Sequence, residues 1–131
     1  MSFYELIKQT EITIDDDKIH CDFGTLEYSI DEYGATVHSI NVNLKRCGVG
    51  TKLVETFENL SEKFGFTSID VPASPTKEAI LFWKSLGYKP ASSDDKYWVN
   101  KIIRSRKDGY WDTLQGVVVM EKNLSKSKKG S

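Results

Sequence analysis

The feature that most constrains this chain is a change of hydrophobic period on either side of a glycine-rich turn. The stretch "ATVHSINVN", residues 35–43, is rich in β-branched residues and predicts a strand at the centre of a sheet. After the turn "KRCGVG", apolar residues recur at helical spacing until Gly65, where glycine is well placed to end a helix. The apolar stripe comprises Val49, Leu53, Phe57, Leu60 and Phe64. The sequence therefore predicts a strand, a tight turn and an amphipathic helix in direct succession.

A second helix, flanked by strands, is expected after this unit. "FTSIDV", residues 66–71, predicts a strand, and "YKPA" predicts the start of a short one. Between them, Ser74 can cap a helix, Pro75 can occupy its first position, and Gly87 can end it. The residues expected to share one face of this helix are Ala79, Phe82, Trp83 and Leu86. Strand–helix–strand units favour parallel pairing in the middle of the sheet.

The two ends of the chain predict further strands. "TEITIDDDKIHCDFGTLEYSI" indicates two short strands around an acidic turn at residues 15–17, and "DEYG" ends the second strand as a hairpin turn. "QGVVVMEKNL" predicts the last strand, and residues 92–114 form an insertion that is expected to be partly ordered. The expected fold class is therefore α/β (α+β) with a mixed sheet. We expect one domain over residues 1–124 and a basic, disordered tail at residues 125–131.

Composition excludes several classes of protein. Of the 131 residues, 39% are hydrophobic and 28% are charged, which indicates a globular rather than a disordered chain. The net charge of −1 disfavours nucleic acid as a partner. The two cysteines, Cys21 and Cys47, have no metal-ligand spacing, so no metal site is expected. The N-terminus lacks the apolar core of a signal peptide and no apolar run approaches about 18 residues, so we expect a cytoplasmic protein that does not bind membranes.

The glycine turn predicts an anion site. The first N–H groups of a helix have no internal partners, the helix dipole adds positive charge there, and Lys45 and Arg46 add more. A phosphate or pyrophosphate is the expected ligand. The dinucleotide motif GxGxxG fails because Leu53 replaces its third glycine, and the P-loop motif fails because Lys45 replaces its first. Taken alone, the glycine pair fits equally a tight turn beside a solvated basic pair.

Two motifs together resemble one family. "KRCGVGTKL" after a β-branched strand resembles the [Q/R]xxGx[G/A] pyrophosphate loop of the GCN5-related N-acetyltransferases (GNAT), with Lys45, Gly48 and Gly50 in the first, fourth and sixth positions. "AILFWKSLGY", residues 79–88, resembles the end of the family's next helix. Both motifs occur at the expected separation, and the resemblance covers roughly residues 36–90.

The resemblance implies a fold and a cofactor. The fold is a GNAT-like mixed, largely antiparallel sheet with a central splayed parallel strand pair and helices on both faces. Acetyl-CoA would lie between the splayed strands. Its pyrophosphate would be held by the loop residues Lys45, Arg46, Cys47, Gly48, Val49, Gly50 and Thr51, chiefly through main-chain N–H groups. The main chain of Ile40, Asn41 and Val42 would pair with the pantetheine, and Phe82 and Trp83 would flank the cofactor.

The implied reaction is direct acetyl transfer to a primary amine. Trp83 stands where the family often has a tyrosine general acid, so Tyr88, Tyr97, Tyr110 or solvent would have to protonate the thiolate. The chain before the first strands is short for the two helices that often cover the acceptor. We therefore expect an open groove that suits a protein or peptide amine.

His38 and Asp70 are the candidates for the base that deprotonates the amine. His38 lies on the strand before the loop, near where the family often places a base, and its unperturbed pKa suits that role. Asp70 lies on the other splayed strand. Each can equally be a hydrogen-bonded or solvated residue, as can Glu27 and Tyr28. A covalent role for Cys47 is disfavoured because the family transfers the acetyl group directly.

The insertion leaves other functions open. Its basic residues lie between the pairs Tyr97–Trp98 and Tyr110–Trp111, a composition that fits acceptor recognition, a homodimer contact or single-stranded nucleic acid, with the first two favoured. The alternative to an enzyme is a non-catalytic regulator that binds acetyl-CoA or CoA and acts through a protein partner. The replacement of the family's tyrosine by Trp83 supports that alternative.

Overall fold

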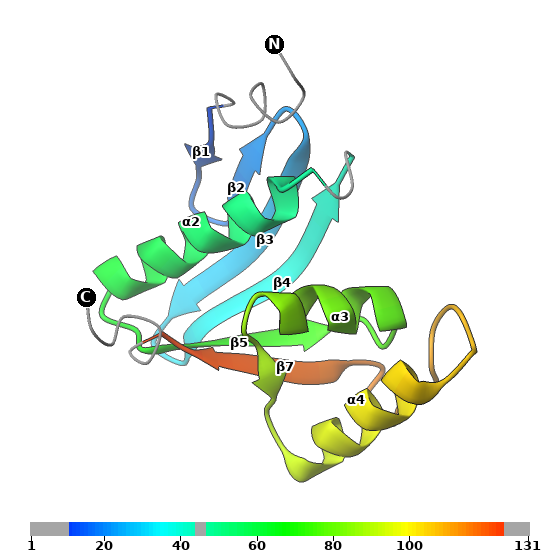
Figure 1. Cartoon of the computed structure of the whole chain (residues 1–131). Helices are drawn as coiled ribbons and strands as arrows, with labels where there is room; N and C mark the ends of the chain where they lie inside the picture. The colour runs from blue at the N-terminus through cyan, green and yellow to red at the C-terminus, as the bar shows by residue number, and fades with distance from the viewer. Residues whose placement is uncertain (1–10, 44–46, 125–131) are drawn as a thin grey trace. The chain divides into compact units, whose positions relative to one another are not determined.

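A computed structural model of the chain describes residues 11–43 and 47–124 (Figure 1). The chain divides into two compact units, Met1–Ile69 and Asp70–Ser131. The strands are hydrogen-bonded in the order β1-β2-β3-β4-β5-β7-β6. Four of the pairings are antiparallel, and the helical connection from β4 to β5 is typical of the parallel pair. The mixed, largely antiparallel sheet expected from the sequence is confirmed.

The first unit is an antiparallel meander covered by one helix. The strands are β1 (Thr13–Ile14), β2 (Lys18–Cys21), β3 (Gly24–Asp31) and β4 (Gly34–Val42). Helix α2 (Val49–Lys63) packs on β2, β3 and β4, as Figure 1 shows. The fully buried residues of this unit include Ile19, Leu26, Val37, Leu53 and Phe57. The sheet contributes alternate residues to this core, and the helix contributes the first three residues of its predicted stripe, Val49, Leu53 and Phe57. The last two differ from the prediction, since Leu60 is half-buried and Phe64 at the helix end is 66% exposed.

The N-terminal strands differ from the prediction in one place. The sequence predicted a single strand from the acidic turn to "DEYG", whereas the structure has two strands, β2 and β3. Cys21 pairs with Gly24, so Asp22 and Phe23 form a two-residue hairpin loop. The signal was the "DFG" tripeptide, whose aspartate and glycine are common in such turns.

The second unit begins with β5 (Ser68–Ala73), which straddles the boundary between the units. It continues with α3 (Lys77–Ser85), β6 (Lys89–Pro90), α4 (Ser93–Arg104) and β7 (Val118–Asn123). Strand β7 is hydrogen-bonded between β5 and β6, and α4 packs against α3, β6 and β7. The buried residues of this unit include Ile80, Trp83, Tyr88, Val99, Ile102 and Met120.

Helix α3 starts later than predicted. Thr76 is its N-cap, and the Thr76 side chain accepts a hydrogen bond from the Ala79 N–H at 3.1 Å. Ser74 and Pro75 therefore precede the helix, because the threonine hydroxyl already satisfies the exposed N–H group. The buried face also differs, since Ile80 and Trp83 are buried while Phe82 is only half-buried. The predicted helix end is confirmed by Gly87, whose φ is +92°.

The insertion contains a complete helix that the sequence analysis did not assign. Ser92 caps α4 by accepting a hydrogen bond from the Asp95 N–H at 3.2 Å. The loop after α4 is tied to the start of α3, because the Trp111 N–H donates to the Pro75 carbonyl at 2.9 Å. The insertion is therefore a folded part of the second unit.

Within the described ranges, 11–43 and 47–124, no helix is long and apolar enough to cross a membrane. The predicted tail at residues 125–131 lies outside the described residues.

Candidate functional site

Helix α2 begins at the glycine turn for which the sequence predicts an anion site. Gly48 is the N-cap, and its carbonyl accepts the first helical hydrogen bond from the Lys52 N–H at 3.0 Å. In the part of the chain that the structure describes, no side chain caps this end and the first turn carries no acidic residue. The N–H groups of the first turn and the positive end of the dipole are therefore not neutralised by a side-chain oxygen.

Glycine is required at position 48 by the backbone conformation. Its φ is +85°, in the left-handed region that residues with a Cβ rarely adopt. A Cβ added there would meet no described atom within 4 Å. Among the described residues, none occupies the space beside Gly48. The next two residues, Val49 and Gly50, are buried and anchor the helix start against the core.

Of the other predicted loop residues, the structure describes Cys47 and Thr51. Thr51 and Cys47 are half-buried on either side of the helix start. Lys45 and Arg46 lie outside the described residues, so their predicted contribution of charge stays a prediction.

The end of β4 is held by β3. Ile40, Asn41 and Val42 pair with Leu26, Thr25 and Gly24, respectively. The Asn43 N–H donates to the Phe23 carbonyl at 2.8 Å, which extends the pairing past the strand. A Cβ on Gly24 would lie 2.8 Å from the Asn41 carbonyl oxygen. The absence of a side chain at Gly24 therefore lets the two strands approach closely just before the glycine turn.

His38 lies at a β-bulge. Glu27 pairs with Ser39 and Tyr28 pairs with Val37, so His38 is the extra residue on β4. Its side chain is exposed, and its Nε2 lies 2.8 Å from the Ser29 hydroxyl oxygen. Bulges often re-aim a side chain next to an active site. The hydroxyl gives this ring a fixed hydrogen-bonding partner within the unit.

Tyr28 is not suited to act as a base. Its hydroxyl donates to the Asp15 carbonyl oxygen. Burial, followed by the charges of Asp16, Asp17 and Asp15, raises the pKa of the Tyr28 phenol above its ordinary value of 10.0. The phenol is therefore held in its neutral, hydrogen-bond-donating form.

The candidates in the second unit differ in exposure. Asp70 on β5 is exposed. Trp83 is 3% exposed, and its ring packs edge-on between Phe82 and Tyr88, with centroid separations of 5.1 and 5.0 Å. Phe82 is half-buried and is thus the more accessible of the two predicted cofactor neighbours. Of the candidate acids, Tyr88 is buried whereas Tyr97 and Tyr110 are exposed.

Metal ligands do not gather in the described part of the chain, where no group of three or more His, Cys, Asp or Glu side chains could hold an ion. The groups that the sequence predicts to take part in transfer are the main-chain N–H groups at the start of α2, the His38 imidazole of the first unit and the Asp70 carboxylate of the second.

Comparison with known proteins identifies the fold. No protein-family model and no curated protein matches the sequence. The structure is similar to that of the anti-CRISPR protein AcrVA5, with 21% identity, a TM-score of 0.57, and coverage of 81% of this chain and 96% of that one. It is similar to the ribosomal-protein-S18-alanine N-acetyltransferase from Escherichia coli, with 18% identity, a TM-score of 0.55, and coverage of 91% and 76%.

A third similar structure is a putative N-acetyltransferase from Lactobacillus plantarum, with 18% identity, a TM-score of 0.56, and coverage of 82% of this chain and 66% of that one. These structural similarities establish the fold of the chain. The chain has the GNAT fold, as the two sequence motifs predicted.

Proposed function

We propose that this protein is an acetyl-CoA-dependent N-acetyltransferase that transfers an acetyl group to a primary amine of a protein or peptide by direct attack. One observation carries the proposal. In a chain with the GNAT fold, α2 opens on a left-handed glycine, Gly48, without a side-chain cap or an acidic first turn in the described residues. A site of this kind fits a diphosphate.

The binding role falls mainly to the main chain. The N–H groups at residues 47–51 would hold the diphosphate, and Lys45 and Arg46 would add positive charge beside it. The main chain of Ile40, Asn41 and Val42 would pair with the pantetheine arm. Close packing of Gly24 against Asn41 supports this role, because it fixes the end of β4 against β3. From the resemblance, Phe82 and Trp83 would lie beside the cofactor.

Acetyl-CoA supplies an acetyl thioester when it is bound. The acceptor amine must be neutral to attack, so a base must take its proton, and His38 or Asp70 would serve directly or through water. The bulge and the Ser29 hydrogen bond favour His38, because both orient its ring. As the C–S bond breaks, the thiolate must gain a proton. Buried Trp83 offers no acidic group for this, so an exposed tyrosine or solvent would supply the proton.

One neighbour supports a protein acceptor, because it is named for acetylating an alanine of ribosomal protein S18. A cytoplasmic location and a homodimer remain predictions from the sequence.

The alternative function is a regulator that binds acetyl-CoA or CoA without catalysis. This alternative is favoured by the burial of Trp83, which stands where the family often has its tyrosine general acid. Intact-mass spectrometry of amine-bearing peptides incubated with the protein and acetyl-CoA separates the two functions. The enzyme predicts a peptide that gains one acetyl group. Stabilisation by acetyl-CoA without acetylation of any amine class would favour the regulator, and absence of both would contradict the proposed function.

A further inference from the structure

Two shallow grooves run along α4 and meet at Asn100. The first, of about 590 Å³, is lined by Lys101 and Arg104 together with Tyr97 and Trp111. The second, of about 530 Å³, contains three lysines. Every charged residue that lines either groove is basic, although the chain as a whole carries a net charge of −1. We call the set the α4 basic surface, which comprises Lys84, Lys89, Lys96, Lys101 and Arg104.

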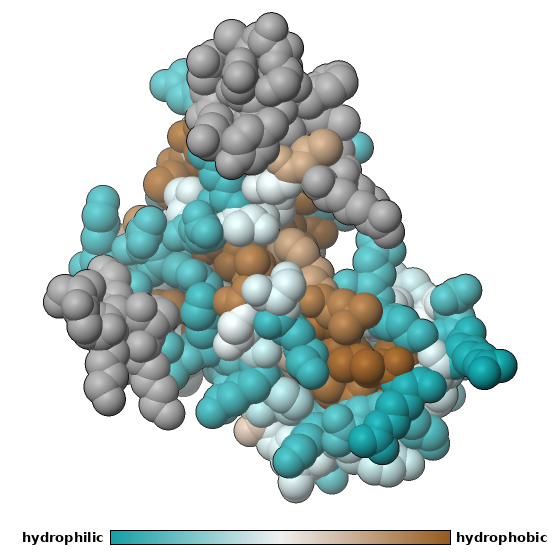
Figure 2. All heavy atoms as spheres, in the orientation of Figure 1, coloured by the Kyte–Doolittle hydropathy of each residue, from teal (hydrophilic) through white to brown (hydrophobic). Residues whose placement is uncertain are grey.

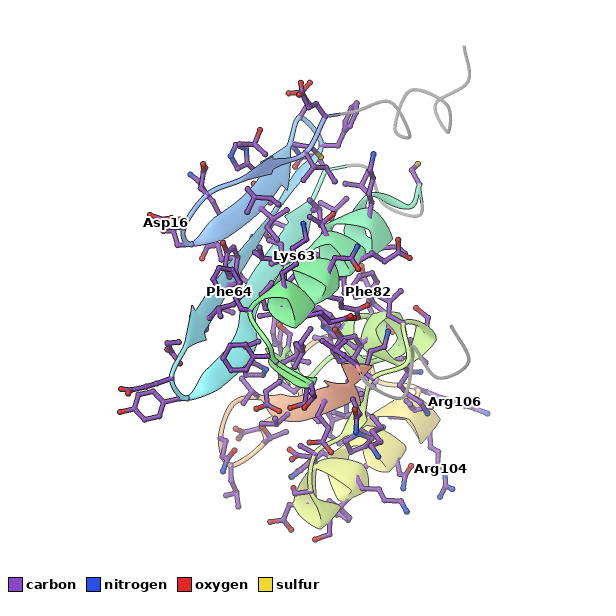
Figure 3. All side chains as sticks on the ribbon, turned by 90° about the vertical axis from the view of Figure 1, so that its left-hand side faces the viewer. Asp16, Lys63, Phe64, Phe82, Arg104 and Arg106 are labelled. Carbon is purple, nitrogen blue, oxygen red and sulfur yellow. The ribbon has the colours of Figure 1, made fainter. Side chains whose placement is uncertain are left out.

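The cations of this surface are accessible. All five residues are exposed, and among the described residues none of them forms an ion pair. Figure 2 shows a mostly hydrophilic surface over α4 and the loop that follows it. The side chains of Arg104 and Arg106 extend outward at the C-terminal end of α4 (Figure 3). Unneutralised charge gathered on neighbouring elements of one folded unit, here α3, β6 and α4, is a footprint for an anionic partner.

A hydrogen-bond donor in the same groove also lacks an acceptor. Trp111 lines the first groove, and its indole Nε1 is a buried side-chain nitrogen with no hydrogen-bond partner among the described residues. Buried polar groups in folded proteins nearly always have a partner, so an unpaired N–H group needs an explanation. Because the nitrogen is covered in the free chain, an acceptor oxygen of a bound molecule would satisfy it once the Trp111 side chain, or the Lys101 and Lys107 side chains over its ring, move aside.

We propose that the α4 basic surface binds an acidic segment of the protein that is acetylated. This inference rests on the proposed function, because it names how the acceptor protein is recognised. The carboxylates of the segment would pair with the basic side chains, and a carboxylate or main-chain carbonyl oxygen would accept from Trp111 Nε1. Attraction between the acidic segment and the basic side chains would thus bring the acceptor protein to the second unit before the acetyl group is transferred.

The aromatic rings favour a peptide over single-stranded nucleic acid. The Lys101 ammonium lies 5.5, 5.6 and 5.8 Å from the ring centroids of Tyr97, Trp98 and Trp111. The rings also meet edge to face, with interplanar angles of 79° for Tyr97–Trp98 and 62° for Trp98–Trp111. Rings that face a cation and stand steeply to one another offer no flat platform on which successive bases stack.

The test uses the full chain without acetyl-CoA and a fluorescent peptide of alternating glutamates with one lysine. Anisotropy should show binding that weakens with salt, while the matched glutamine peptide and an oligothymidylate of equal length bind at least about tenfold more weakly. The double variant Lys101→Glu/Arg104→Glu should bind the glutamate peptide about tenfold more weakly. The control Lys18→Glu/Lys63→Glu changes the net charge equally on the first unit and should bind normally.

A second variant, Trp111→Phe, keeps a ring but removes Nε1. It should weaken peptide binding several-fold with an unchanged melting temperature, because that nitrogen has no described partner to lose. Equal loss in both charge-reversal variants, tighter binding of the oligonucleotide, or a dimer that blocks peptide binding would overturn the inference. Thermal stabilisation by acetyl-CoA is measured in parallel, so failure of the proposed function is seen separately from failure of peptide binding.

Discussion

The Nε2 atom of His38 lies 2.8 Å from the hydroxyl oxygen of Ser29, across the pair of strands that the His38 bulge distorts. A bulge and a hydrogen bond together fix an exposed imidazole in the middle of β4. That is the arrangement expected of a side chain that must receive a proton in a defined direction.

His38→Gln is therefore expected to lower kcat/KM by about 10²–10⁴-fold, the usual contribution of a general base. Steady-state kinetics with the acetylated peptide checks this. The chain offers a matched control in His20, its other histidine, which pairs with Asp15 at 2.9 Å. His20→Gln should retain normal activity. Full activity in His38→Gln would rule out His38 as the base and leave Asp70.

Ser29→Ala tests whether the hydroxyl positions His38. Loss of this partner frees the ring, and we expect kcat to fall by about ten- to a hundredfold while the KM for acetyl-CoA is unchanged. Ser39→Ala, on the neighbouring residue of β4, is the control. A kcat for Ser29→Ala equal to that of the wild type would show that Ser29 has no positioning role.

Gly24→Ala is expected to disturb the end of β4 from the opposite strand. Its Cβ would lie 2.8 Å from the Asn41 carbonyl oxygen, so the backbone must shift at a cost of about 1–3 kcal/mol. Acetyl-CoA affinity should fall with it, as measured by calorimetry. Gly34→Ala at the other end of the same strand pair has a strained φ of +142° but no described atom within 4 Å of its Cβ. That variant should lose stability and keep its affinity.

The raised pKa of the Tyr28 phenol predicts that the folded protein loses stability in alkaline solution. Its folded-state pKa is raised by burial and by Asp16, Asp17 and Asp15, so its stabilising effect is complete below pH 10 and is lost as the pH rises toward the folded-state pKa. Urea unfolding at neutral pH and above pH 10 measures this. Tyr28→Phe should lose about 1 kcal/mol at neutral pH, from the hydrogen bond to Asp15, and show a smaller decline in alkali. An equal decline in both proteins would contradict the assignment.

Ser92→Ala should destabilise the chain by about 1 kcal/mol, because the Ser92 hydroxyl caps α4. Ser93→Ala provides a matched control on the adjacent exposed serine, which caps nothing. Equal melting temperatures for both variants would show that the cap contributes little.

Strongly periodic elements were predictable from the sequence. Helix α2 follows from an apolar stripe that includes the buried residues Val49, Leu53 and Phe57, and it is ended by Gly65 at φ +88°. Helix α4 was not predicted from the sequence because only two of its residues, Val99 and Ile102, are buried. Its remaining surface is aromatic and basic, so apolar periodicity is faint, although the Ser92 cap and the acidic first turn were present as signals.

Some features of the predicted site could likewise be inferred from the sequence, and others could not. The proposal that the turn binds an anion follows from local backbone chemistry around Gly48, which the sequence reveals directly. The bulge at His38 and the close approach of Gly24 to Asn41 depend on the register between strands. Register is set by long-range packing, so neither feature could be derived from the order of residues alone.

The central claim is that main-chain groups at the start of α2 hold the diphosphate of acetyl-CoA, and a pair of glycine variants tests it most directly. Gly48 and Gly65 lie at opposite ends of α2, with φ of +85° and +88°, and neither would bring a Cβ within 4 Å of a described atom. Both Gly→Ala changes should therefore cost a similar free energy of unfolding, about 1 kcal/mol.

The thermal shift produced by acetyl-CoA then distinguishes the two glycine variants. At a ligand concentration about a hundredfold above Kd, the wild type and Gly65→Ala should each gain about 2.7 kcal/mol, while Gly48→Ala should gain almost nothing. An undiminished gain in Gly48→Ala would contradict the claim.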